Sequence, residues 1–213
     1  MNFLPSLPTI LTFSAACILL AATPGPDMTL MLGRTLSNGR KAGFSVLMGT
    51  AVGCIVHTVL AVIGISALLA ASTTAFLVLK IVGALYLLWL AFGAIFKGST
   101  FTLEEQKSST KGFWNDFLTG LGVNVLNPKV VIFFLTFLPQ FVSASDPNAW
   151  QKMLFLGVLL DFIATPIMIV ILLTADSFAN TLKANPKINR TIDYIFGSVF
   201  AIFAVRILFT QGK

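Results

Sequence analysis

Charged residues are scarce in this sequence. Asp, Glu, Lys and Arg make up 10% of its 213 residues, whereas a soluble domain carries about 25%. Hydrophobic residues make up 56%, and the mean hydropathy is +0.91. This composition excludes an ordinary soluble domain and predicts an all-α integral membrane protein.

The residue types of familiar catalytic sites are also few. The chain has one histidine, His57, and neither a His-Glu-x-x-His nor a Gly-x-Ser-x-Gly motif, which are signatures of zinc proteases and serine hydrolases. We therefore expect no enzymatic activity, no metal and no cofactor. The two cysteines, Cys17 and Cys54, lie inside apolar stretches, and we interpret them as small hydrophobic residues.

Basic residues are absent before Arg34. A secretory signal peptide begins with a positively charged region, so we interpret the N-terminal apolar stretch as a retained first span. The chain has 14 Lys and Arg against 8 Asp and Glu, but the basic residues lie in short segments between apolar runs. This distribution is typical of a membrane protein and not of a nucleic-acid-binding protein.

Apolar stretches long enough to cross the hydrocarbon core, which takes about 20 residues of helix, occur six times. They cover residues 4–33, 43–70, 75–96, 114–138, 152–174 and 191–210. Lysine and arginine concentrate in three of the joints, at residues 34–41, 97–111 and 176–190. The positive-inside rule places these joints in the cytoplasm and both termini outside.

The first span contains a helix-breaking motif, Pro24-Gly25-Pro26-Asp27. Each proline lacks an amide donor and collides with the carbonyl four residues earlier, while glycine adds flexibility. An interrupted helix inside the bilayer exposes backbone groups that lipid cannot satisfy, so it occurs only where protein or a polar cavity surrounds it. Asp27 follows this break directly, which makes the position a candidate functional site.

The fourth span carries a second break, at Asn127-Pro128-Lys129. Asn is a favoured N-cap and proline is tolerated at the first helical position, so we predict that a half-helix begins here. Each half of the chain then has three spans, the first of them broken. Because the number is odd, the halves run in opposite directions, as in secondary transporters. We predict two inverted three-helix repeats, residues 1–98 and 112–213, joined by a cytoplasmic linker at 99–111.

The two half-helices are expected to meet near the bilayer midplane. At about 1.5 Å per residue, Asp27 lies roughly 10 Å from Arg34, and Asn127 roughly 20 Å from Trp114. Helix N-termini carry partial positive charge and free amides, so the two ends together form a site for a carboxylate. The predicted substrate-binding residues are Pro24, Gly25, Pro26, Asp27, Asn124, Asn127, Pro128 and Lys129.

Two more ionisable residues lie within apolar spans. Asp161 shares a helix face with Gly157 and Thr165, and His57 lies on the face of a small-residue stripe that marks a close helix contact. Both side chains should point into the bundle, because an unpaired charge facing lipid is costly. Together with Asp27, they are the predicted proton-coupling residues.

Structural roles remain open for some of these residues. His57 could be a neutral core histidine bonded to a carbonyl, and Lys129 could neutralise Asp27 or Asp161. Four other charged residues lie near span ends, where side chains can reach the interface, and we assign them no chemistry. They are Lys80, Asp116, Asp193 and Arg206.

Further motifs accompany the two breaks. They are Phe133, Leu138-Pro139-Gln140-Phe141, Val78-Leu79-Lys80, Tyr86-Leu87-Leu88-Trp89-Leu90 and Phe196-Gly197-Ser198. Together with both breaks, they resemble the lysine exporter (LysE/RhtB) family of bacterial amino-acid efflux permeases over nearly the whole chain. His57 and Asp161 match polar positions of its homoserine/threonine branch. One departure is Ala91-Phe92-Gly93, where the family often has glycine directly after the Trp-Leu pair.

The resemblance implies a six-span carrier in the bacterial cytoplasmic (inner) membrane that exports amino acids or their derivatives in exchange for protons. The substrate carboxylate would rest on the amides of residues 26–29 and 128–130, and its ammonium would meet Asp27. The implied partners are an amino-acid substrate, protons and the lipid bilayer. A homodimer stays open, because Gly49-x-x-x-Gly53 could pack within one chain or between two copies.

A second hypothesis from another class is a transmembrane thiol-redox conduit that uses Cys17 and Cys54. Distant relatives of the LysE/RhtB family carry electrons through paired cysteines beside proline, whereas neither cysteine here adjoins a proline. A thiol in apolar surroundings is also unreactive. The sequence does not identify the exported amino acid, and it does not decide whether Asp27 or Asp161 carries the proton.

Overall fold

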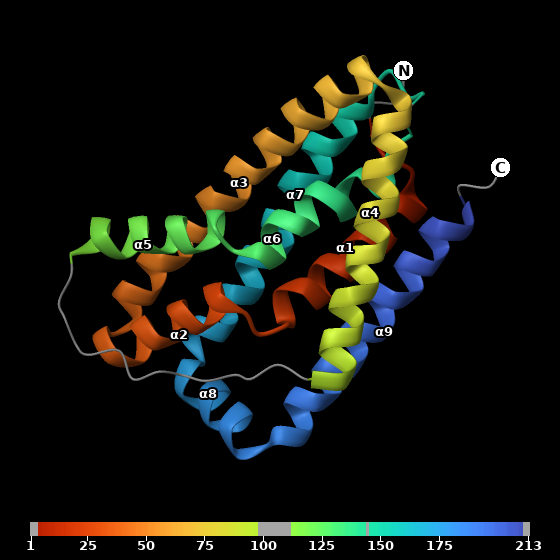
Figure 1. The fold of residues 1–213 in the computed structure, drawn as a ribbon. Helices are drawn as coiled ribbons and strands as arrows, with labels where there is room; N and C mark the ends of the chain where they lie inside the picture. Colours follow the sequence, from red (N-terminus) through yellow and green to blue (C-terminus); the bar gives the residue numbers. More distant parts are fainter. Residues whose placement is uncertain (1–3, 98–111, 144, 211–213) are drawn as a thin grey trace.

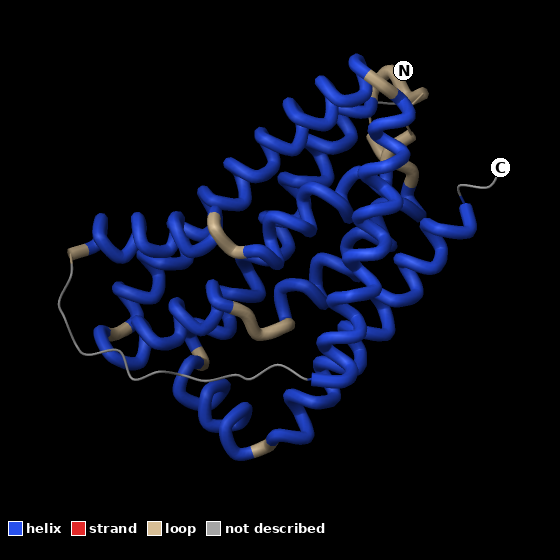
Figure 2. Tube along the Cα trace, in the orientation of Figure 1, coloured by secondary structure: helices blue, strands red, loops and turns tan. Residues whose placement is uncertain are grey.

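A computed structural model describes residues 4–97, 112–143 and 145–210 of the chain. Within these ranges the chain is helical, with short connections and no strand (Figure 2). The all-α prediction is therefore confirmed for the described part. The predicted linker at 99–111 lies outside the described residues.

Within the described ranges, most consecutive helices are separated by only a few residues (Figure 1). They are α1 (Leu7–Ala22), α2 (Pro26–Asn38), α3 (Arg40–Ala71), α4 (Thr73–Phe92), α5 (Phe113–Val125), α6 (Pro128–Ile132), α7 (Ala149–Leu173), α8 (Ala175–Ala184) and α9 (Pro186–Thr210). Shorter π-helical turns occur at η1 (Gly93–Lys97) and η2 (Phe133–Phe137), and a 3₁₀ turn at η3 (Leu138–Phe141). The predicted polar joint at 176–190 is largely helical, because α8 occupies most of it.

The first break lies between α1 and α2, where the proline motif predicts it. Thr23 ends α1, and both its amide and its hydroxyl donate hydrogen bonds to the carbonyl of Leu19. Pro26 is the first residue of α2, a position that requires no amide donor. The two helices bend by 49° relative to each other.

The second break lies between α5 and α6. Asn127 is the N-cap of α6, and its side chain accepts a hydrogen bond from the amide of Lys129 at 3.0 Å. Pro128 occupies the first helical position. The segment from Pro128 to Phe141 bends by 50° from α5. Both predicted helix breaks are therefore confirmed.

The connection between α2 and α3 consists of Gly39 alone. Its φ of 85° lies in the left-handed region that favours glycine. The sequence predicts a polar joint over residues 34–41, whereas the helices continue through most of that range. Arg34 consequently lies on α2 and not in a loop.

Arg34 forms a buried ion pair with Asp116 of α5. The distance between Arg34 Nε and Asp116 Oδ1 is 3.4 Å, and the two side chains are 7% and 3% exposed. Because Asp116 and Asp193 lie near span ends, their side chains are predicted to reach the membrane–water interface. Both side chains are buried, so this prediction is wrong. Charges that are buried in a protein need partners. Because α2 packs on α5, Arg34 is in position to be the partner of Asp116.

Helices α3 and α5 pack through glycine. A Cβ atom added at Gly49 would lie 2.7 Å from the amide nitrogen of Leu121, and one added at Gly120 would lie 3.0 Å from Val46 Cα. Their backbones therefore approach more closely than any side chain would permit. The small-residue stripe that includes Gly49 and Gly53 serves a contact within this chain.

Three described helices are long and apolar enough to cross a membrane: Arg40–Leu68, Leu77–Phe96 and Ala149–Leu173. The number rises to five if each bent pair is one span. The protein is thus a membrane protein with several membrane-capable helices. Helix α9 covers the sixth predicted span but is not among these candidates, so the six-span arrangement stays a prediction.

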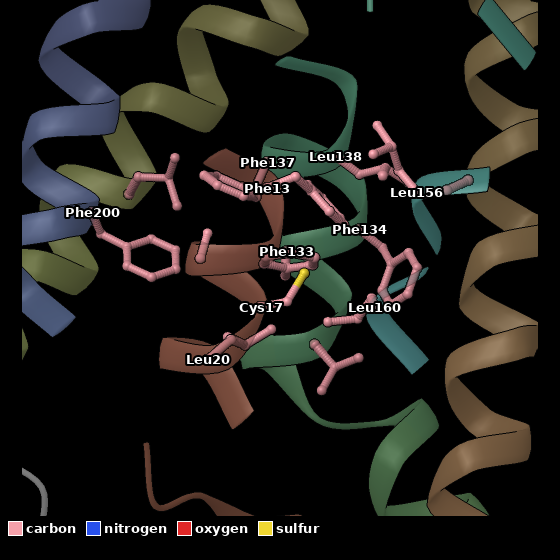
Figure 3. Close-up of a cluster of buried hydrophobic side chains, with 14 of the residues drawn as sticks. Phe13, Cys17, Leu20, Phe133, Phe134, Phe137, Leu138, Leu156, Leu160 and Phe200 are labelled. Atoms are coloured by element: carbon pink, nitrogen blue, oxygen red, sulfur yellow. The ribbon is translucent and has the colours of Figure 1, made fainter. Parts of the chain in front are cut away.

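Two clusters of buried apolar side chains hold the helices together. One contains Phe13, Phe133, Phe137 and Phe200, and brings together α1, η2 and α9 (Figure 3). The rings of Phe133 and Phe137 lie 4.9 Å apart, centroid to centroid. The second cluster joins α2, α3, α7 and α8. Its members are Met28, Leu30, Met31, Leu32, Val46, Leu47, Ile171, Leu172 and Ala175.

Candidate functional site

A cavity of about 80 Å³ lies where the two helix breaks come together. Its wall is formed by the ends of α1 and α2, by α3, by the ends of α5 and α6, and by α7. The cavity brings together several residues that the sequence analysis selected. They are Gly25, Asp27, Asn124, Asn127, Lys129 and Asp161.

Asp27 lies in the first turn of α2 and lines the cavity. Its Oδ2 atom accepts a hydrogen bond from Asn124 Nδ2 at 2.8 Å. Its Oδ1 atom is buried and accepts no hydrogen bond of standard geometry, although the Asn127 side chain lies close enough to interact with the carboxylate. A buried carboxylate oxygen normally has a partner, so Asp27 retains capacity to bind a cationic group.

Lys129 enters the cavity from the first turn of α6. Its Nζ atom donates to the carbonyls of Leu20 and Thr23, at 3.1 and 2.8 Å, which belong to the end of α1. An ammonium group has three donors, so these two bonds leave one. Gly25 provides the space, since a Cβ atom there would lie 3.3 Å from Lys129 Nζ.

Asn124 connects both breaks and α3. Besides the bond to Asp27, its backbone carbonyl lies 3.3 Å from His57 Nε2, and its side chain contacts Cys54 Sγ at 3.8 to 3.9 Å. A Cβ atom at Gly53 would lie 2.9 Å from Asn124 Cβ, so glycine on α3 creates the room that Asn124 occupies.

His57 lies behind Asn124 and is not among the residues that line the cavity. Its ring is buried, stacks on Phe134 with centroids 5.4 Å apart, and faces the Asn124 carbonyl. This environment matches the structural role considered for His57 in the sequence analysis, that of a core histidine bonded to a carbonyl. Any influence of His57 on the cavity would pass through Asn124.

Asp161 lines the cavity from α7. Its Oδ1 atom accepts a hydrogen bond from Thr165 Oγ1 at 3.3 Å, as their shared helix face predicts. Gly157, on the same face, packs against Thr58 of α3. Asp27 and Asp161 thus reach one cavity from two different helices.

The backbone amides predicted to hold a carboxylate at the second break are already occupied. The amide of Lys129 donates to the Asn127 side chain, and that of Val130 donates to the Asn127 carbonyl at 3.0 Å. At the first break, the amide of Thr29 donates to the Gly25 carbonyl. Positive charge from the second break therefore reaches the cavity through the Lys129 ammonium and not through these amides.

The prolines of both motifs shape the breaks without lining the cavity. Pro24, Pro26 and Pro128 are absent from its wall, and Pro26 and Pro128 are exposed. Of the predicted binding residues, these three are not placed at the cavity by the structure. Their effect is on the course of the backbone, which positions Asp27 and Lys129.

Several cavity residues were not singled out by sequence analysis. They include Leu20 and Ala21 of α1, Met28 and Met31 of α2, Leu47, Thr50 and Ala51 of α3, Val130 of α6, and Leu160, Ala164 and Met168 of α7. Most are apolar residues within apolar helices, so no compositional signal distinguishes them. Thr50 is polar, but its hydroxyl bonds to the Leu47 carbonyl at 2.8 Å, an ordinary pattern in helices.

Residues 18–211 match the family model for LysE type translocators, which covers most of the chain. The chain belongs to the LysE type translocator family. The broader part of the resemblance drawn from the motifs is thereby confirmed.

Several proteins are similar to this LysE type translocator over most of their length. The membrane protein YrhP of Bacillus subtilis (strain 168), itself uncharacterised, is 28% identical over 206 residues, covering 93% of this chain and 97% of that protein. The uncharacterised membrane protein YahN of Escherichia coli (strain K12) is 27% identical, with coverage of 87% and 82%. A leucine efflux protein of Klebsiella pneumoniae is 24% identical, with 95% of each chain covered. No solved structure matches this chain.

Proposed function

We propose that this LysE type translocator exports amino acids and binds them in the cavity between the two helix breaks. Family membership supports translocation, and the similarity to a leucine efflux protein supports an amino acid as the transported molecule. The homoserine/threonine branch is a narrower hypothesis within this proposal. We keep threonine and homoserine among the substrates to be tested.

The observation that carries the proposal is a pair of oppositely charged side chains that face one cavity without direct contact between their charged atoms. Asp27 and Lys129 both line it, yet the ion pairs recorded among the described residues do not include them. Asp27 Oδ1 accepts no hydrogen bond of standard geometry, and Lys129 has one unused donor. An amino acid presents an ammonium and a carboxylate on one carbon, which complements this arrangement.

In the proposed complex, the substrate ammonium binds Asp27 and its carboxylate binds Lys129. Asn124 holds Asp27 in place, and Asn127 and Gly25 complete the wall beside Lys129. The N-terminus of α2 adds partial positive charge on the carboxylate side. Charged hydrogen bonds in surroundings of low dielectric are strong, so this contact would supply recognition of the amino-acid core.

Proton coupling is the next part of the proposal. Asp161 lines the cavity from α7 and accepts a hydrogen bond from Thr165. A carboxylate inside a membrane is costly unless it is paired or protonated. Asp161 would take up a proton when substrate leaves and release it when substrate binds. His57 and Asp27 stay secondary candidates for this role.

The proposed architecture is that of six spans in two inverted repeats, residues 1–98 and 112–213, joined by the linker at 99–111. Both termini would lie outside the cytoplasmic (inner) membrane of a bacterium. The matching bends of 49° and 50° at the two breaks support this symmetry. Alternating access would follow from movement of one repeat against the other around the cavity.

Transport by purified protein in liposomes tests the proposal. Liposomes loaded with unlabelled amino acid would take up labelled amino acid in exchange, and Asp27→Asn is expected to reduce this rate at least about 30-fold, as expected for loss of a buried charge partner. The matched control is Asp176→Asn, which makes the same change at an exposed residue of α8. Undiminished exchange in the Asp27 variant would refute the assigned role.

A second variant separates proton coupling from binding. Asp161→Asn is expected to exchange amino acids across the membrane while no longer responding to an imposed pH gradient. Cells loaded with dipeptides provide the matching assay, because the amino acids that they release can be scanned in the medium. A pH-gradient response that persists in the Asp161 variant would exclude Asp161 as the coupling residue.

A further inference from the structure

Two carbonyl groups at the end of α1 lose their usual donors at the first break. In an uninterrupted helix, the carbonyl of Leu20 would accept a hydrogen bond from the amide of residue 24, and the carbonyl of Thr23 from the amide of residue 27. Residue 24 is proline, which has no amide hydrogen, and Asp27 already belongs to the next helix, α2. Both carbonyl oxygens therefore need another donor.

Lys129 supplies that donor to both carbonyls. Its Nζ atom donates one hydrogen bond to the carbonyl of Leu20, at 3.1 Å, and one to the carbonyl of Thr23, at 2.8 Å. Lys129 lies in the first turn of α6 and 106 residues after Thr23 in the sequence. A single side chain at the second break thus completes the hydrogen bonding of the first break.

The positive charge of Lys129 suits this position. The C-terminus of a helix carries partial negative charge, which favours a cation. In the interrupted helices of secondary transporters, freed carbonyls and the C-terminal ends of half-helices coordinate the coupling cation. The end of α1 offers the same kind of oxygen atoms, and here the cation that binds them belongs to the chain itself.

The two breaks leave room for this side chain and fix its origin. A Cβ atom at Gly25 would lie 3.3 Å from Lys129 Nζ, 3.8 Å from its Cε and 3.9 Å from its Cδ. The outer part of the Lys129 side chain therefore runs along Gly25, where any other residue would crowd the ammonium group. At the second break, the side chain of Asn127 accepts the hydrogen bond of the Lys129 amide and so fixes the start of α6.

We propose that the ammonium group of Lys129 is a tethered cation that fills a cation-binding site at the C-terminus of α1, in place of a free metal ion. The site takes a primary ammonium group, which can donate to both carbonyls at once. Its occupation ties α1 to α6 and leaves the third donor of Lys129 for the substrate carboxylate. Transport therefore requires no sodium, potassium or lithium ion. Only this consequence for transport rests on the proposed function.

Chemical rescue of Lys129→Ala tests the cation site without transport. The substitution removes the part of the side chain that corresponds to n-propylammonium. In detergent and without any amino acid, n-propylammonium is expected to raise the unfolding temperature of the variant by at least about 3 °C and to leave that of the wild type unchanged. Propanol lacks the charge and tetramethylammonium lacks N–H donors, so neither should stabilise the variant. Absence of an effect of n-propylammonium, or an equal effect of propanol, would overturn the inference.

The matched control is Lys41→Ala, the same substitution at an exposed lysine in the first turn of α3. Propylammonium is expected to leave its unfolding temperature unchanged. An equal rise in both variants would mean that the amine acts on the protein in general, which would also overturn the inference. Because no amino acid is present, a lysine that served only to bind the substrate carboxylate would give no stabilisation by the amine.

Exchange in liposomes extends the test to transport. Lys129→Ala is expected to lower the exchange rate at least about 30-fold, because two hydrogen bonds of a charged group are lost. Propylammonium should raise this rate again at least about tenfold, and propanol should not. Full activity of Lys129→Ala without the amine would contradict the inference. If the amine stabilised the variant while wild-type protein exchanged no amino acid, the proposed function would fail and the cation site would stand.

Two further measurements do not depend on the folding of Lys129→Ala. Wild-type exchange is expected to be unchanged when N-methylglucamine replaces all alkali-metal ions, and a strict requirement for one of these ions would contradict a site that is filled from within. Lys129→Met keeps an unbranched apolar side chain but has no ammonium group. It is expected to exchange as poorly as Lys129→Ala, and wild-type activity in this variant would overturn the inference.

Discussion

Asn124 on α5 donates a hydrogen bond to Asp27 on α2, with 2.8 Å between Nδ2 and Oδ2. The two residues are far apart in the sequence. Asp27 directly follows the first helix break, and Asn124 lies shortly before the second. Their contact joins the two interrupted spans at the cavity. Because Asn124 also contacts His57 and Cys54, it fixes Asp27 relative to α3 as well.

Loss of the Asn124 amide should weaken transport. Hydrogen bonds to charged groups contribute about 1.5–3 kcal/mol, so Asn124→Ala is expected to lower the exchange rate about 10- to 100-fold. The control is Asn115→Ala, the same substitution at an exposed position of α5. Equal rates for the two variants would show that the bond to Asp27 does not matter for transport.

Two glycines of α3 should respond in opposite ways to substitution by alanine. A Cβ atom at Gly53 would lie within 2.9 Å of Asn124, whereas one at Gly64 meets nothing within 4 Å. Gly53→Ala is expected to displace Asn124 and reduce transport. Gly64→Ala is expected to stabilise the helix by about 0.5–1 kcal/mol. Thermal unfolding in detergent and exchange assays would distinguish these effects, and similar behaviour of both variants would contradict the packing described.

The buried pair of Arg34 and Asp116 should be sensitive to removal of one partner. Asp116→Leu leaves the Arg34 charge buried and unpaired, which is expected to lower the free energy of unfolding by about 3–5 kcal/mol. The double variant Arg34→Met with Asp116→Leu replaces both charges and should recover most of this loss. Denaturant unfolding followed by tryptophan fluorescence measures both values. A double variant as unstable as the single one would argue against a pairwise interaction.

A pH-dependent contact lies in the loop before α7. Lys152 donates a hydrogen bond to Asp146, and this bond, with a second from the Asn148 amide, holds the pKa of Asp146 below its ordinary value. Since the folded-state pKa is lowered, the contact stabilises fully above the usual range for Asp and is lost as the pH falls through the lowered value. The effect should be small, because the pair is near the surface.

The measurement for this loop is thermal unfolding between pH 6 and pH 3. Wild-type protein is expected to unfold at a higher temperature than Asp146→Asn near neutral pH, with the difference disappearing at the acidic end. Asp176→Asn serves as the control, since Asp176 is an exposed residue in the first turn of α8. A difference that grows with acidity would mean that the sign assigned to this contact is wrong.

Local chemistry made the helix breaks predictable. Proline removes a donor wherever it occurs, and Asn before proline begins a helix by capping it, so neither feature depends on distant residues. Placing Asp27 and Asn127 at a common level required only the rise of a helix. The structure brings both residues to one cavity.

Contacts between distant segments could not be predicted in the same way. The sequence does not reveal that Lys129 bonds the carbonyls at the end of α1, nor that Arg34 meets Asp116, because both depend on how the bent helices pack. The side chain of Asn127 also takes the Lys129 amide that was expected to bind a carboxylate. The side chain of an N-cap residue accepts a hydrogen bond from an amide of its own helix, so that amide is not free to bind a ligand. The predicted carboxylate site did not take this into account.

The glycine contact between α3 and α5 limits how the protein can open. At Gly49 and Gly120 the two backbones are in direct contact, so no side chain lies between them whose rotation could loosen the contact. These helices come from different halves of the chain, so the proposed movement of one half against the other would have to pivot at this contact without pulling it apart. The walls that line the cavity beside it, α2 from the first half and α7 from the second, would then change their spacing and so control access.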